Sequence, residues 1–217
     1  MKPTGCNRWA WGAPPFPEGA SPMPPVMGPF SLDRVVRAVE LVRQRLLRAT
    51  SALERAGIPY AVAGGNAVAL WVSRVDGSAV RNTSDVDLLV RRTDFDAIRE
   101  TLIATGFVYR QTEGWELFLD EPGSRARDGI HLVFAGERVK PTETMVNPEV
   151  TESEAGGEYR VLSLRALVQI KLTAYRDKDR THLRDLLELG IIDATWVPRY
   201  PAELGERLQA LIDTPGG

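Results

Sequence analysis

Two aspartates spaced two residues apart are the clearest chemical feature of this 217-residue sequence. Asp85 and Asp87 lie in the segment RNTSDVDLLV (residues 81–90), whose last six residues have the composition of a strand. Residues i and i+2 of a strand point to the same side, so both carboxylates would share one face. Like charges that close repel each other unless a cation or solvent neutralises them. The spacing therefore predicts either a divalent-cation site or a solvated strand end.

A glycine pair upstream favours the cation site. Gly64-Gly65 lies between a short apolar segment (60–63), predicted to be a buried strand, and a predicted helix (66–73). Alone, such a pair indicates only a tight turn. Glycines before a helix N-terminus also let backbone N–H groups approach phosphate oxygens. Carboxylate-held divalent cations can bridge those phosphates. The two motifs together therefore predict a phosphate cradle facing a metal-binding pair.

The elements that must position these motifs follow an alternating order. We expect a helix from about 33 to 56, whose apolar positions recur at spacings of four and three residues. The remaining core elements are a strand at 60–63, a helix at 66–73, a strand ending at 90, a helix capped by Asp94 and running to about 104, and strands at 107–109, 115–119 and 130–134. This order predicts an α/β (α+β) fold, a mixed sheet packed by helices on one face.

The chain divides into three predicted regions: an arm at 1–30, the core at 31–140, and a C-terminal helical region at 141–217. In the last region, residues 140–162 are expected to be irregular, followed by helices at 164–175, 181–189 and 201–212. The arm is rich in Pro and Gly, which predicts an extended or disordered segment. Alternatively, its aromatic residues dock on the chain's own domain, on a partner protein or in a homo-oligomer.

Bulk composition excludes several classes of protein. A net charge of −2 gives no global basic field for nucleic acid, although a local basic surface is still compatible with it. The single cysteine, Cys6, excludes a disulfide framework and a CxxC metal site. No apolar run approaches the roughly 18 residues needed to span a bilayer. The N-terminus shows no continuous apolar signal region, so we expect a cytoplasmic protein without a membrane partner.

The segments AVAGGNAVALW (61–71) and RNTSDVDLLV (81–90) resemble the nucleotidyltransferase superfamily with the DNA polymerase β-type core. The most similar branch is that of the AbiEii- and MenT-like bacterial proteins. Residues 167–180, LVQIKLTAYRDKDR, are similar to the lysine-containing helix of that branch, and HLRDL at 182–186 continues the similarity. The resemblance extends over roughly residues 31–195 and leaves out the arm.

The resemblance implies roles for individual residues. Asp85 and Asp87 would bind Mg²⁺ (or Mn²⁺), and Gly64 and Gly65 would line the triphosphate of an NTP. Asn66 would bond a phosphate or cap the helix. The residues leading into the aspartate strand, Arg81, Thr83 and Ser84, would contact the nucleotide. For Arg81, a solvated loop charge is an equal alternative.

Lys171 lies within the apolar stripe of its predicted helix, three and four residues from Val168 and Leu167. A lysine at such a position either snorkels to solvent or meets an anion. The resemblance favours an ammonium placed on the triphosphate, opposite the glycine turn. On the next predicted helix, His182 and Asp185 face one way and could bond each other.

His131 marks a departure from the family. In related proteins a third acid lies on a later strand, whereas the matching segment here is GIHLVF (129–134). Imidazole can act as a base, but hard cations such as Mg²⁺ prefer oxygen ligands. Asp128, Glu137 or, more favourably, Glu116 would supply the missing oxygen, since 115–119 should pair with the His131 strand. His131 is thus a third catalytic candidate beside Asp85 and Asp87.

The resemblance implies transfer of a nucleoside monophosphate from an NTP to a hydroxyl, with release of pyrophosphate. The acceptor would be RNA (tRNA), a protein or a small molecule, in a toxin–antitoxin or defence setting. Because of His131, the alternative is a catalytically impaired nucleotide-binding or protein-interaction module.

Overall fold

The computed structural model describes residues 31–112 and 114–215 of the chain. From Asp33 onward these residues belong to one compact unit, which is the part discussed here. The arm expected at residues 1–30, together with its proposed docking on a partner, lies outside the described residues.

Six α-helices and seven strands make up the described part of the chain. The helices are α1 (Leu32–Arg55), α2 (Gly64–Ser73), α3 (Phe95–Ala104), α4 (Leu164–Ala174), α5 (Asp177–Glu188) and α6 (Ala202–Asp213). The strands are β1 (Tyr60–Val62), β2 (Val86–Val90), β3 (Val108–Thr112), β4 (Trp115–Leu119), β5 (Ile130–Phe134), β6 (Ser153–Ala155) and β7 (Arg160–Leu162). Short 3-10 helices occupy Gly77–Ala79, Arg92–Asp94, Ala126–Asp128 and Ala194–Arg199.

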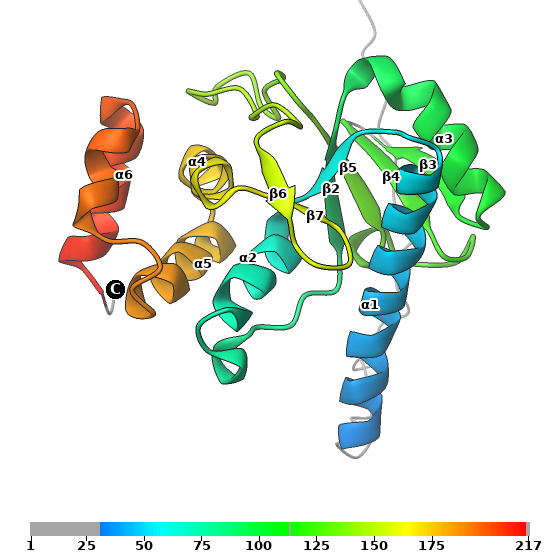
Figure 1. The fold of residues 1–217 in the computed structure, drawn as a ribbon, viewed down its shortest axis with the longest axis horizontal. Coiled ribbons are helices and arrows are strands. Elements are labelled where there is room, and N and C mark those ends of the chain that lie inside the picture. The colour runs from blue at the N-terminus through cyan, green and yellow to red at the C-terminus, as the bar shows by residue number, and fades with distance from the viewer. Residues whose placement is uncertain (1–30, 113, 216–217) are drawn as a thin grey trace, which may run out of the picture. The chain divides into compact units, whose positions relative to one another are not determined.

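All seven strands form a single mixed sheet in the order β3-β4-β5-β2-β1-β7-β6 (Figure 1). The pairs β2–β5 and β1–β7 are parallel, and the others are antiparallel. In the central parallel pair Asp87 lies directly opposite His131. Because side chains alternate along each strand, this register places the two residues on the same face of the sheet.

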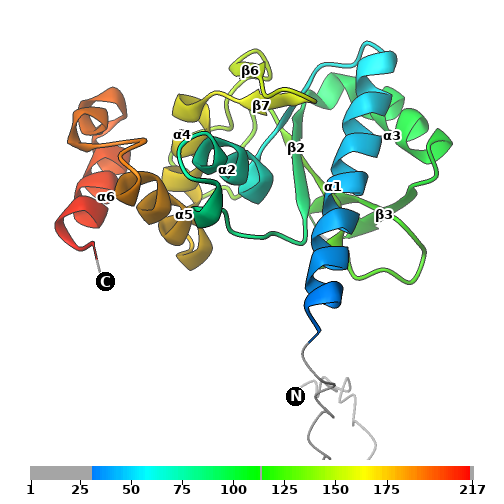
Figure 2. The ribbon, with the colours of Figure 1, turned by 60° about the horizontal axis from the view of Figure 1, so that its bottom comes forward.

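Helices cover both faces of the sheet (Figure 2). On one face α1 and α3 pack against alternate strand residues such as Leu88 and Leu132. On the other face α2 and α4 lie next to the sheet, beside residues such as Leu89 and Val161, and α5 and α6 pack on these helices. The mixed α/β class and the C-terminal helical region are confirmed, but the expected single helical layer was wrong. The physical reason is that β2 carries buried apolar side chains on both sides, so both sides need a cover.

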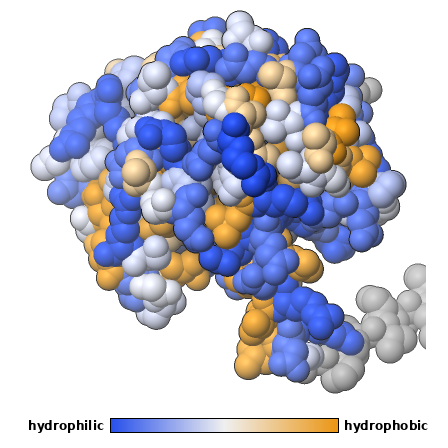
Figure 3. Space-filling view, turned by 45° about the vertical axis from the view of Figure 1, so that its right-hand side comes forward, coloured by the Kyte–Doolittle hydropathy of each residue, from blue (hydrophilic) through white to orange (hydrophobic). Residues whose placement is uncertain are grey.

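The first half of α1 lies apart from these core layers. Its apolar side chains up to Leu41 remain exposed, among them Val35, Val36 and Val39, and apolar surface is visible next to the grey residues (Figure 3). Further along the helix Leu46, Ala49, Ala52 and Leu53 are buried. The regular apolar spacing of α1 therefore extends over residues that do not pack against the sheet. Although α1 spans 24 residues, no helix in the described ranges combines the length and the apolar character needed to cross a membrane.

Two strands lie in the stretch that the sequence predicts to be irregular. β7 joins the sheet parallel to β1 through Val161, and β6 pairs antiparallel with β7. Each strand has only three residues, which is too short to show a periodic apolar pattern. The sheet consequently continues past residue 140, where the predicted core ends.

Candidate functional site

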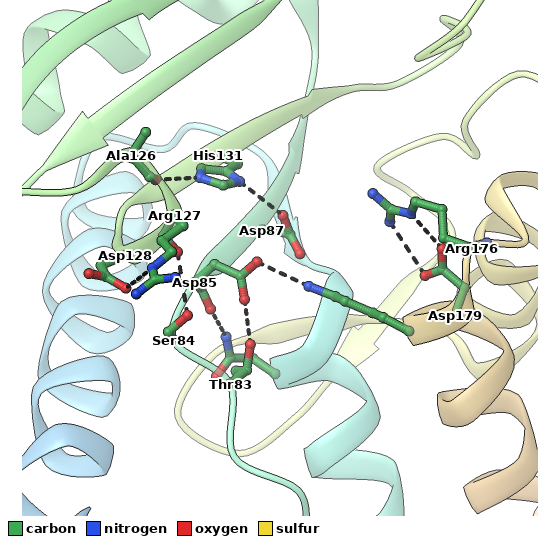
Figure 4. A network of polar contacts seen from close by, with 12 residues as sticks. Thr83, Ser84, Asp85, Asp87, Ala126, Arg127, Asp128, His131, Arg176 and Asp179 are labelled. Carbon is green, nitrogen blue, oxygen red and sulfur yellow. Dashed lines mark hydrogen bonds and ion pairs between the residues drawn. The ribbon is translucent and has the colours of Figure 1, made fainter. Parts of the chain in front are cut away.

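The two aspartates and the histidine meet at one end of the central parallel strands (Figure 4). Asp85 precedes β2, Asp87 lies within it, and His131 lies opposite on β5. Each of the three offers one ligand atom such that all three atoms lie within 4.8 Å of one another. Residues far apart in the sequence thus form the three-membered cluster on which a cation site depends.

Two glycines at the start of α2 allow the aspartate strand to approach. A Cβ atom on Gly64 would lie 1.8 Å from Oδ2 of Asp87, and its φ of +61° also favours glycine. A Cβ on Gly65 would lie 2.8 Å from the Thr83 hydroxyl oxygen. The first turn of α2, where backbone N–H groups are free to bind anions, therefore lies directly against the carboxylates.

Asp85 is held by neutral and cationic donors. The Thr83 hydroxyl donates to its Oδ1, and Nζ of Lys178 on α5 lies 3.1 Å from its Oδ2. Burial raises the pKa of Asp85, but the Thr83 hydrogen bond and the Lys178 charge outweigh burial and bring that pKa below its usual value. Asp85 is therefore ionised at neutral pH.

At Asp87 the destabilising effects are larger. Burial, followed by the charge of Asp85, raises its pKa, and the opposing charges of Lys171 and Lys178 do not reverse the direction. The cluster as a whole thus combines two oxygen donors and one nitrogen donor, and the negative charge of Asp87 is disfavoured by burial and by Asp85. A divalent cation fits this donor set and would neutralise the repulsion between the carboxylates.

The orientation of His131 is fixed from two sides. Its Nε2 lies 2.8 Å from the carbonyl oxygen of Ala126, which can only accept, so Nε2 carries the donated proton. Its Nδ1 therefore faces the cluster, 3.8 Å from Oδ1 of Asp87. The ring also packs against Trp115, with centroids 6.0 Å apart.

None of the three acids considered as a substitute ligand joins the cluster. The register places Leu117 opposite His131, so Glu116 points to the other face of β4, where its carboxylate accepts a hydrogen bond from Tyr109. Asp128 pairs with Arg125, and Glu137 pairs with Arg92. The expectation for Glu116 was wrong because only alternate residues of a strand share a face.

The cluster opens into a cleft of about 400 Å³. Five of the residues that line it are cationic, against three carboxylates: Arg127, Lys140, Lys171, Arg176 and Lys178 against Asp85, Asp87 and Glu143. Apolar side chains, including Trp115, Val133, Val139 and Ile170, form the rest of its wall together with Asn147. The cleft therefore offers positively charged side chains that can bind phosphates and an apolar surface on which a planar ring can pack.

Lys171 lines this cleft without reaching solvent. Its side chain is 2% exposed, and its Nζ lies 2.9 Å from Oδ1 of Asp179 on α5, which is fully buried. Arg176 donates to the other oxygen of Asp179 at 2.7 Å. Snorkelling does not occur, because the neighbouring helix supplies a buried counter-ion. A contact between Lys171 and nucleotide stays a prediction.

The remaining candidates occupy supporting positions. Asn66 donates from Nδ2 to the backbone oxygen of Asp85 at 2.8 Å, while the N-cap of α2 is Ala63. Arg81 forms a bidentate pair with Asp185 at 2.7 and 2.9 Å. The Ser84 hydroxyl lies 3.4 Å from the carbonyl oxygen of Arg127. Their predicted contacts with nucleotide stay predictions.

Asp185 does not bond His182, although the two lie one turn apart on α5. The Asp185 carboxylate is engaged by Arg81, and Nδ1 of His182 is buried with no hydrogen-bond partner among the described residues. Sequence reasoning also missed Lys178 as a partner of Asp85. Its only sequence signal was its place among the basic residues Arg176, Lys178 and Arg180, which follow the Lys171 helix.

The fold and the site together define a mixed α/β protein with a carboxylate–imidazole cluster beside a helix N-terminus. No protein-family model and no curated protein sequence matches the chain. Among solved structures, the antibiotic-resistance factor ANT(2'')-Ia in solution is similar, with 18% identity, a TM-score of 0.49, and coverage of 79% of this chain and 92% of that chain.

Two further solved structures show similarity at the same level. One is ANT(2'')-Ia in complex with adenylyl-2''-tobramycin, with 15% identity, a TM-score of 0.47, and coverage of 82% of this chain and 99% of that chain. The other is JHP933 from Helicobacter pylori, with 16% identity, a TM-score of 0.48, and coverage of 85% and 77%.

Proposed function

We propose that this protein is a metal-dependent nucleotidyltransferase that moves a nucleoside monophosphate from an NTP to a hydroxyl group. The observation that carries the proposal is the approach of Asp87 to Gly64, which brings a carboxylate cluster against the first turn of a helix. A metal site and an anion site that adjoin in this way suit a substrate that is itself a metal–phosphate complex.

Each part of the cleft has a task in this proposal. Asp85, Asp87 and His131 hold a divalent cation, which when bound supplies positive charge for the reacting phosphate and the leaving pyrophosphate. The N–H groups at the start of α2 bind phosphate oxygens, and Lys178 and Arg176 add charge from α5 and its cap. Positioning and electrostatics would therefore account for most of the rate enhancement.

The acceptor is proposed from the charge of the cleft. Arg127 and Lys140 line it in addition to Lys171, Arg176 and Lys178, while outside the cluster Glu143 is the one lining carboxylate among the described residues. An excess of cations favours an anionic acceptor, so RNA such as tRNA fits better than a cationic small molecule. A protein acceptor, and the toxin–antitoxin or defence setting that the family resemblance implies, belong to the same proposal.

The test is a transfer assay. Wild-type protein with Mn²⁺ or Mg²⁺, each of the four NTPs labelled at the α-phosphate, and total RNA should give labelled RNA. Asp85→Asn and Asp87→Asn should each lower the transfer rate at least about a hundredfold. Asp96→Asn is the matched control, because Asp96 is an exposed aspartate on α3 that does not line the cleft. No label on RNA, protein or small molecule from wild type would contradict the proposal.

A second candidate is a nucleotide-binding module that has lost turnover. The pairing of Lys178 with Asp85 favours it, because an ammonium can compensate that carboxylate without a metal. This candidate predicts NTP binding in equilibrium dialysis together with no transfer in any of the assays above. Transfer that depends on Asp85 and Asp87 would exclude it.

A further inference from the structure

The starting observation is that only one nitrogen of His131 is available to the cluster. Nε2 donates to the Ala126 carbonyl at 2.8 Å, which leaves the Nδ1 lone pair of the neutral ring directed toward the carboxylates. Metal-binding histidines commonly have this arrangement, in which a hydrogen bond from one ring nitrogen to a carbonyl fixes the tautomer and orients the other nitrogen.

The backbone also fixes where that nitrogen lies. Asp87 and His131 are direct partners in the parallel pair β2–β5, and Trp115 packs against the ring. Among the described residues, the only cluster of three potential metal-ligating side chains is Asp85, Asp87 and His131. The three acids that could have replaced the imidazole, Glu116, Asp128 and Glu137, bond elsewhere.

We infer that His131 binds the metal through Nδ1 and makes the site selective for a first-row transition-metal ion, such as Mn²⁺ or Co²⁺, over Mg²⁺. Mg²⁺ is a hard cation that demands oxygen ligands and gives up water reluctantly. Nitrogen ligands bind first-row divalent ions with an affinity that rises from Mn²⁺ to Co²⁺. The inference rests on the proposed function, which supplies the expectation of a metal.

The composition of the chain makes a direct spectroscopic test possible. The sequence has only two histidines, and His182 lies on α5, outside the cluster. In tag-free protein loaded with Mn²⁺, pulsed electron paramagnetic resonance should detect the ¹⁴N coupling of one bound imidazole. His131→Asp should abolish that coupling, whereas His182→Asn should retain it.

Affinity provides the second measurement. Mn²⁺ binding by calorimetry and Mg²⁺ binding by competition should show that His131→Asp lowers the preference for Mn²⁺ over Mg²⁺ at least about tenfold. Circular dichroism of each variant checks that it is folded. The wild-type spectrum tests the inference even if His131→Asp does not fold.

The inference is overturned if wild type binds Mn²⁺ without a nitrogen coupling, if it binds no Mn²⁺, or if the coupling survives in folded His131→Asp. An unchanged Mn²⁺-to-Mg²⁺ ratio in that variant also overturns it. The transfer assay separates this failure from that of the proposed function. Transfer without nitrogen coupling would remove only the inference, whereas nitrogen coupling without transfer would remove only the proposed function.

Discussion

Lys178 on α5 holds its Nζ 3.1 Å from Oδ2 of Asp85, joining two residues that are 93 positions apart in the chain. The contact links the C-terminal helices to the carboxylate cluster. Lys178 is half-exposed, so this pair is worth no more than about 0.2–1 kcal/mol after solvent screening.

Lys178→Met should strengthen Mn²⁺ binding roughly two- to fivefold, because the metal no longer has to displace an ammonium from Asp85. Titration calorimetry measures the effect. Lys140→Met is the control, since Lys140 lines the same cleft without an ion pair to Asp85. Weaker Mn²⁺ binding in Lys178→Met than in Lys140→Met would show that Lys178 supports the metal site.

Gly64→Ala should destabilise the protein more than Gly57→Ala. Both glycines have positive φ, so both substitutions introduce backbone strain of about 1–2 kcal/mol. Only at Gly64 does the added Cβ collide with a side chain, the Asp87 carboxylate, whereas nothing lies within 4 Å of a Cβ at Gly57.

Urea unfolding followed by circular dichroism gives the two losses of stability, and we expect the Gly64 loss to be at least about twice the Gly57 loss. Metal binding should weaken in Gly64→Ala alone, because its Asp87 has to move. Equal losses at the two positions would refute the close contact.

Asp179→Asn should reduce the free energy of unfolding by about 3–5 kcal/mol, because it leaves the ammonium of Lys171 buried without a counter-ion. Denaturant titration measures the loss. Asp177→Asn, on the same helix but 92% exposed, should cost less than about 0.5 kcal/mol. The double variant Lys171→Met/Asp179→Asn should be more stable than Asp179→Asn. A double variant less stable than Asp179→Asn would argue against the buried pair.

Much of the fold could be predicted from local patterns. The limits predicted for the strands at Trp115–Leu119 and Ile130–Phe134 and for the helix at Phe95–Ala104 match the observed ones, because apolar periodicity and turn residues coincide there. The start of α5 was missed by four residues. Asp177 and Asp179 look like loop charges in the sequence, whereas in the structure the Asp179 carboxylate accepts from the backbone N–H and the guanidinium of Arg176, the N-cap residue of α5.

The candidate site was also predicted only in part. The proximity of Asp85 and Asp87 followed from strand alternation alone. The partners of Lys171, Arg81 and Asn66 did not, because each binds a residue on another element, and no local pattern encodes which element will pack against it. The side of β4 that faces His131 likewise depends on the register of pairing, and a shift of one residue exchanges Glu116 for Leu117.

Below neutral pH, His182 should make stability depend on pH. Burial, followed by the charges of Lys171 and Lys178, lowers its pKa to about 4, although Asp179 and Asp185 oppose the shift. As pH falls below about 6.5, His182 binds a proton in the unfolded chain but stays neutral in the folded chain. The free energy of unfolding therefore decreases with falling pH until about pH 4.

The measurement is the free energy of unfolding from pH 7 to pH 5, a window above the titration of most carboxylates. In His182→Asn this free energy should fall less steeply with decreasing pH than in wild type. Parallel curves for the two proteins would mean that His182 is not held in its neutral form.

The parallel pairing of β7 with β1 has a consequence for shortened forms of the chain. Without residues after 140, β1 would become a terminal strand, because its remaining neighbour in the sheet would be β2. All three β1 residues, Tyr60, Ala61 and Val62, are buried and apolar. The strand therefore has none of the charges or prolines that discourage edge-to-edge association of sheets. A fragment ending at 140 should therefore self-associate through this strand and precipitate. In the full chain β7 covers this edge of β1, so the residues after 140 protect the protein from aggregation.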